Sequence, residues 1–107
     1  MNTKKVEVRI VGRWWMHSHE EDGDEGMVFR PSGFTFPPSR GREGFELRPD
    51  HSFTDMAVAP ADGTTPGQGT WEIVNDPSLA ISLRQGKEPA RFLRIVRLDK
   101  NRLVLQF

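Results

Sequence analysis

The 107-residue sequence has no cysteine, no tyrosine and no excess of either charge. Without cysteine it has neither a disulfide framework nor a thiolate zinc site, and nothing indicates an oxidising compartment. Fifteen Lys and Arg balance fifteen Asp and Glu, so no overall charge favours nucleic acid or an acidic membrane as a partner. No segment approaches the roughly 20 apolar residues of a membrane-spanning helix, and residues 1–9 have no apolar stretch of signal-peptide length. We therefore expect a cytoplasmic protein with neither nucleic-acid nor membrane partners.

Apolar and polar residues alternate along most of the chain, which is the pattern of half-buried antiparallel strands. A chain of this length buries one core, so we expect a single domain over residues 1–107. The predicted strands span about 5–18, 27–31, 43–49, 52–59, 69–74, 79–84, 90–98 and 102–107. Turn-forming Gly, Pro, Asn and Asp separate most of them. Because closure removes exposed strand edges, we expect an all-β fold, an antiparallel up-and-down meander of about eight strands closed or nearly closed into a barrel.

The first predicted strand has a definite inward face. Trp14 shares its parity with Val6, Val8 and Ile10, so these side chains are expected to point into the core unless Gly12 marks a bulge. The outward positions are then Trp15, His17 and His19.

Residues 31–44 do not fit a central strand, because they contain three prolines and three glycines. Connections of this length are uncommon in small domains and are usually functional or disordered. Phe34 and Phe36 indicate that the segment packs back onto the domain, across a barrel mouth. An alternative is that the segment inserts into a partner, which would make the protein an interaction or inhibitor module.

Several short patterns together resemble a known family. They are Gly12-Arg13-Trp14, Phe45-x-Leu47 leading through Pro49-Asp50 to Phe53, Gly69-Thr70-Trp71-Glu72-Ile73, Leu79-x-Ile81-x-Leu83 and Leu103-x-Leu105. With this spacing the chain resembles small bacterial lipocalin-like domains of the calycin type, over nearly its whole length. The resemblance implies a lipocalin-like barrel with an internal ligand cavity. It also implies that Trp14 closes one end, stacked under Arg97 or Arg102.

The segment from His17 to Glu25 has the residues of a metal site. His17 and His19 lie two residues apart, so on a strand both imidazoles project from one face. With Glu21 they make a two-histidine, one-carboxylate set that suits zinc or another divalent first-row metal, and Asp22 or Glu25 could replace Glu21. Such a site would make the protein a metal-dependent barrel enzyme. The simpler interpretation is a solvated acidic loop.

Arg40 and Arg42 give the 31–44 segment two guanidinium groups separated by one glycine. Two such groups can bind a carboxylate or phosphate. They can equally pair with the acidic residues at 20–25 and fix the segment in place, which is the interpretation that we favour.

The sequence favours binding over catalysis, because it has no cysteine and no serine in a Gly-x-Ser-x-Gly elbow. The function that we expect is a non-enzymatic barrel that binds a small, partly apolar ligand at its mouth, with arginine available for an acidic group on that ligand and with no cofactor. The expected binding residues are Trp15, Phe29, Phe34, Phe36, Arg40 and Arg42.

Overall fold

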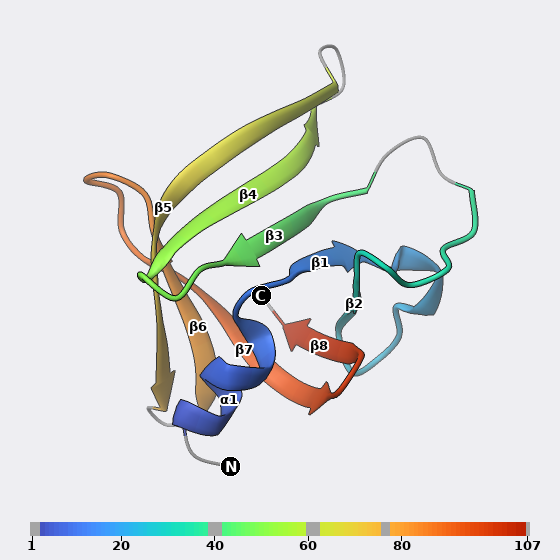
Figure 1. Ribbon diagram of the computed structural model, residues 1–107, viewed down its shortest axis with the longest axis horizontal. Coiled ribbons are helices and arrows are strands. Elements are labelled where there is room, and N and C mark those ends of the chain that lie inside the picture. Colours follow the sequence, from blue (N-terminus) through green and yellow to red (C-terminus); the bar gives the residue numbers. More distant parts are fainter. Residues whose placement is uncertain (1–2, 39–41, 60–62, 76–77, 107) are drawn as a thin grey trace.

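The computed structural model describes residues 3–38, 42–59, 63–75 and 78–106, and the side chains of 56–66 are outside the description. Eight antiparallel strands form a closed barrel, which confirms the expected fold class (Figure 1). The strands are β1 (Trp14–His17), β2 (Met27–Pro31), β3 (Gly44–Leu47), β4 (Ser52–Ala59), β5 (Gly63–Asn75), β6 (Leu79–Arg84), β7 (Arg91–Asp99) and β8 (Arg102–Gln106). A helix α1 (Thr3–Ile10) precedes β1, and a 3-10 turn η1 (His19–Glu21) follows it.

Strand order explains the long connection between β2 and β3. From β3 to β8 the strands pair in sequence, but β2 pairs with β8 and β1 lies between β2 and β3. Since both β2 and β3 are antiparallel to β1, they run in the same direction. The chain must therefore travel from the end of β2 back to the opposite end of the barrel, which a short hairpin turn cannot do.

The predicted long N-terminal strand is wrong over residues 5–10, which form α1 instead. Val6 and Ile10 are fully buried on one face of the helix, while Val8 is 76% exposed. A spacing of four residues places two side chains on the same side of both a strand and a helix, so Val6 and Ile10 fit either structure. The helix ends at Ile10, and two residues later Gly12 has a φ of +87°, which favours glycine.

The inward face of β1 is the opposite of the predicted one. Trp15 is 0% exposed and its indole N–H donates to the carbonyl of Ile10 at 3.0 Å, whereas Trp14 is half-buried. Because residues 6–10 are helical, the inward and outward alternation of a strand does not run from them into β1, and they do not predict which residues of β1 face inward. Trp15 thus takes the end-closing place expected of Trp14, and the arginine near its ring is Arg13, 5.4 Å from the ring centroid.

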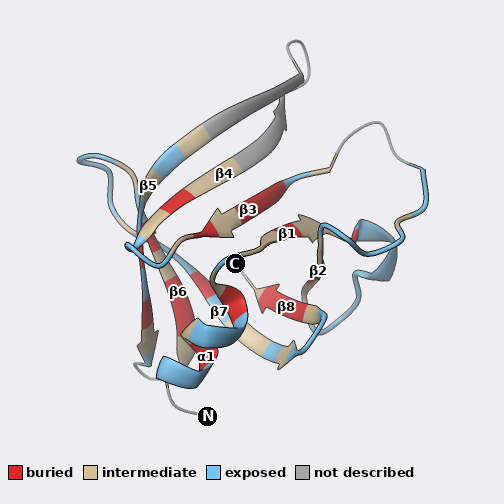
Figure 2. Cartoon of the chain, in the orientation of Figure 1, coloured by how far each residue is buried: buried red, intermediate tan, exposed pale blue. Residues whose placement is uncertain are grey.

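The two ends of the barrel differ. Val6 and Ile10 of α1 belong to the same hydrophobic cluster as the inward residues of the strands, so the helix covers one end, here called the α1 end (Figure 2). The opposite end, where β3 and β7 begin and β6 ends, is here called the open end. Among the described residues, no helix has the length and apolar character needed to cross a bilayer.

Candidate functional site

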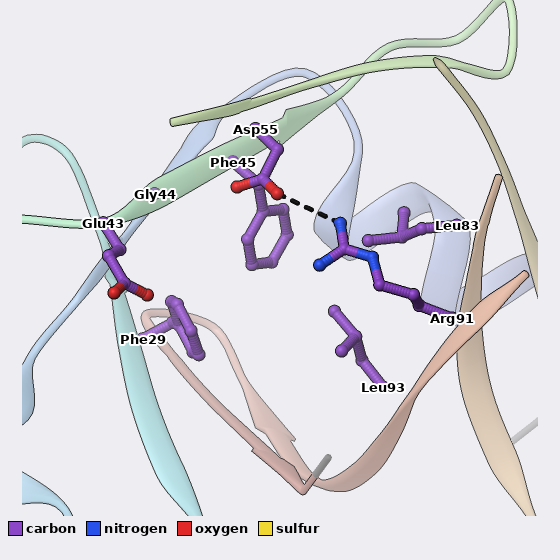
Figure 3. Close-up of a pocket in the computed structure, with 8 residues that line it drawn as sticks. All are labelled: Phe29, Glu43, Gly44, Phe45, Asp55, Leu83, Arg91 and Leu93. Atoms are coloured by element: carbon purple, nitrogen blue, oxygen red, sulfur yellow. Dashed lines mark hydrogen bonds and ion pairs between the residues drawn. The ribbon is translucent and has the colours of Figure 1, made fainter. Parts of the chain in front are cut away.

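The open end contains a hollow, here called the cup, with a volume of about 120 Å³ (Figure 3). Four apolar side chains from four different strands form its walls: Phe29, Phe45, Leu83 and Leu93. Gly44 contributes only backbone to the lining, at the start of β3. A Cβ at Gly44 would point away from the cup and would lie 2.9 Å from the backbone carbonyl oxygen of Trp15, so a larger residue would force the strand to shift.

Three charged residues line the rim of the cup: Glu43, Asp55 and Arg91. Arg91 donates to Asp55 across the mouth at 3.1 Å, joining β7 to β4 (Figure 3). The Arg91 side chain is 53% exposed, so water screens this ion pair and its contribution to stability is small. Two carboxylates against one guanidinium leave the rim with a formal charge of −1.

The cup is shallow because side chains fill the barrel beneath it. Trp15, Leu47, Phe53, Ile81, Leu103 and Leu105 are all 0% exposed and belong to one hydrophobic cluster. An enclosed cavity of roughly 150 Å³ holds a benzene ring. The cup therefore suits one small ring or a short alkyl chain.

The expected binding residues are spread over several parts of the structure. Phe29 lies in the wall of the cup, but Trp15 is sealed in the core, where it cannot line a mouth. Phe34 and Phe36 lie on the connection after β2, with ring centroids 5.0 Å apart. Arg40 is outside the described residues.

Arg42 fixes the β2–β3 connection to the segment that follows β1. Its guanidinium donates to both carboxylate oxygens of Glu20, at 2.8 and 2.6 Å, and to the carbonyls of His17 and Pro37. It also lies 4.5 Å from the ring centroid of Phe36. For this arginine the pairing with the acidic run that we favoured is confirmed, and four of its five N–H donors are engaged.

Two further glutamates of the acidic run, Glu21 and Glu25, are paired with arginines in the same way. Glu21 accepts two hydrogen bonds from Arg30, at 2.8 and 2.7 Å, and Glu25 accepts two from Arg97, both at 2.7 Å. The Arg42 and Arg30 guanidinium groups lower the pKa values of the Glu20 and Glu21 carboxyls, respectively, to about 2. These acidic side chains therefore hold the segment between β1 and β2 against the barrel.

The three predicted metal ligands do not converge. The Nε2 atom of His17 lies 2.9 Å from Asp22, and its ring stacks on Phe29 at 5.2 Å. His19 is on η1, its Nε2 atom is 3.6 Å from Glu20, and Glu21 is paired with Arg30. Within the described ranges, no three His, Asp or Glu side chains are placed to hold a metal ion. The metal site stays a prediction without support from this geometry.

The sequence did carry a signal for the rim residues that the alternation analysis missed. Asp55 has the parity of the buried Phe53, and Arg91 has the parity of the buried Leu93. A charged residue at an inward position of a strand indicates a place where the side chain reaches water, such as the rim of a barrel. Glu43 precedes β3 and gives no such signal.

A closed antiparallel barrel of eight strands belongs to the class of small barrels whose interior is filled by side chains or holds one small ligand. The chain is a member of the lipocalin-like domain family, which matches residues 10–105. Comparisons with curated proteins and with solved structures gave no match. Lipocalin-like barrels generally bind small hydrophobic ligands.

Proposed function

We propose that this protein binds a small, partly apolar molecule at the open end, without catalysing a reaction. The apolar part enters the cup between Phe29, Phe45 and Leu93, and the polar part stays at the charged rim. The observation that carries this proposal is an apolar hollow with a few polar groups at its mouth in a lipocalin-like barrel, the usual composition of a small-molecule site.

The size of the cup limits the affinity. A ring that buries about 150 Å² of apolar surface gains at most about 4 kcal/mol, and the loss of freedom on association offsets part of this gain. The ring alone therefore gives a dissociation constant of about 1 mM or weaker. Tighter binding requires a ligand that extends beyond the cup and makes further contacts at the rim.

The charge of the rim favours a neutral or cationic polar group. Glu43 and Asp55 repel a carboxylate, and the one guanidinium, that of Arg91, is already paired. The preference for acidic ligands rested on Arg40 and Arg42, and four of the five N–H donors of Arg42 are occupied. We therefore propose an amine or alcohol in place of an acid.

Titration calorimetry with benzylamine, benzyl alcohol and benzoate tests this proposal, because the three probes share one ring and differ in charge. We expect benzylamine and benzyl alcohol to bind at about millimolar concentration and benzoate to bind at least several-fold more weakly. A Leu83→Phe variant fills the cup and should abolish binding. Phe92, which is 58% exposed, provides the matched control Phe92→Leu, which should bind normally. Failure of all three probes to bind, or equal binding by the filled variant, would contradict the proposal.

Neither alternative function has a specific observation in its favour. The proposed ligands of a metal-dependent enzyme are engaged with other partners. The connection expected to insert into a partner is tied to the barrel through Arg42.

A further inference from the structure

The α1 end carries a group of cationic side chains that the proposed function does not use. Arg9 is in the last turn of α1, Arg13 precedes β1, and Lys100 is in the turn between β7 and β8. These three side chains line one hollow of about 330 Å³. A second hollow of about 350 Å³ shares Arg13 with the first and also contains Ser32, Gly33 and Phe34.

Arg13 is held in place while most of its donors stay available. One terminal N–H donates to the carbonyl of Lys100 at 2.8 Å, and the guanidinium lies 5.4 Å from the ring centroid of Trp15. A guanidinium has five N–H donors, so the contact with Lys100 leaves four for another acceptor. A cation fixed in this way loses little conformational freedom when it binds an anion.

In the described part of the chain, no carboxylate forms an ion pair with these three cations. The residues that line the two hollows include no Asp or Glu. Asp99 precedes Lys100 in the chain, and its charge acts on Arg30 and Arg97. The dipole of α1 favours a cation at Arg9, but it has no such effect on Lys100, which belongs to another element. Three positive charges around a concave surface raise the local concentration of anions.

We propose that the α1 end is a second binding site, one that takes a phosphate monoester. A dianion matches three converging cations better than a singly charged carboxylate does. The phosphate group lies against Arg9, Arg13 and Lys100, and the organic part extends into the adjoining hollow toward Phe34. The site is at the opposite end of the barrel from the cup, so it does not depend on the function proposed there.

Phenyl phosphate, added to ¹⁵N-labelled protein and followed by NMR, tests this site. We expect saturable shifts at the amides of Arg13, Gly33 and Asn101, with weaker binding as ionic strength rises. Benzoate should bind more weakly at the same amides. Vesicles that contain phosphatidic acid present the same phosphate chemistry on a lipid, and we expect free phenyl phosphate to bind in preference to them.

A double variant, Arg9→Gln with Lys100→Gln, should weaken phenyl phosphate binding about tenfold without unfolding the protein, since both side chains are exposed. The double variant Arg84→Gln with Arg94→Gln removes the same charge from exposed positions elsewhere and should bind like the unmodified protein. Equal weakening in both variants would show that only net charge matters and would overturn the proposal. Absence of shifts at the α1 end, or binding to vesicles but not to free phenyl phosphate, would also overturn it.

Discussion

A pair of leucine truncations measures where the barrel interior is filled. Leu83 is 3% exposed and lines the cup, whereas Leu103 is 0% exposed and lies in the filled part of the core. Replacing either by alanine removes three carbons, worth about 2.4 kcal/mol of transfer free energy at about 0.8 kcal/mol each. At Leu103 an enclosed void also remains, and the total loss should be about 4 kcal/mol. At Leu83 the new space opens into the cup, where water enters it, so the loss should be about 2.5 kcal/mol.

Urea denaturation at 25 °C compares the free energies of unfolding of Leu83→Ala and Leu103→Ala with that of the unmodified protein. We expect the unfolding free energy to fall with urea concentration at similar slopes in all three proteins. The free energies of unfolding of the two variants should differ by at least about 1 kcal/mol. The enlarged cup of Leu83→Ala should also bind naphthylmethylamine more tightly than the unmodified protein does. Equal losses, or a larger loss for Leu83→Ala, would refute the placement of the cup.

Three further predictions follow from local contacts. Because the folded-state pKa values of Glu20 and Glu21 are lowered to about 2 from 4.5, their ion pairs stabilise the protein fully above about pH 4.5. That stabilisation should be lost as the pH falls towards 2, and circular dichroism should follow the resulting acid transition. Added salt should make the transition smaller, because it screens the ion pairs. Gly69→Ala places a methyl group against a carbonyl of the neighbouring strand and should lower the melting temperature by about 5 °C or more, whereas Gly33→Ala, which meets nothing within 4 Å, should change it little. Asp55→Asn removes the carboxylate partner of the rim arginine, so calorimetry should show tighter benzoate binding with less than about 1 kcal/mol lost in stability.

Strand alternation predicted the barrel well because inward and outward positions differ strongly in polarity over most of the chain. The last five predicted strands match β4 to β8 closely, although β5 begins earlier, at Gly63. The N-terminal helix was missed because Val6 and Ile10 fit both periods, and the surface exposure of Val8 cannot be read from its residue type.

The candidate site was harder to predict from the sequence than the fold, because its residues come together only through the order in which the strands are arranged around the barrel. The aromatic residues Phe34 and Phe36 attracted attention as rare apolar residues in a loop, but neither lines the cup: Phe34 lines a hollow at the α1 end and Phe36 lies against Arg42. Arg91 and Asp55 are 36 residues apart and meet only because the barrel closes. The opposite charges of the two loops did predict the pairing of Glu20 with Arg42, because this prediction did not depend on the register of the strands.

The most direct test of the central claim, that the open end of a filled barrel holds the ligand, is to map benzylamine binding on ¹⁵N-labelled protein. We expect saturable shifts at the amides of Gly44, Phe45, Leu83 and Leu93 and unchanged amides along α1. Shifts confined to α1, or none at the cup when benzylamine is well above millimolar concentration, would contradict the account.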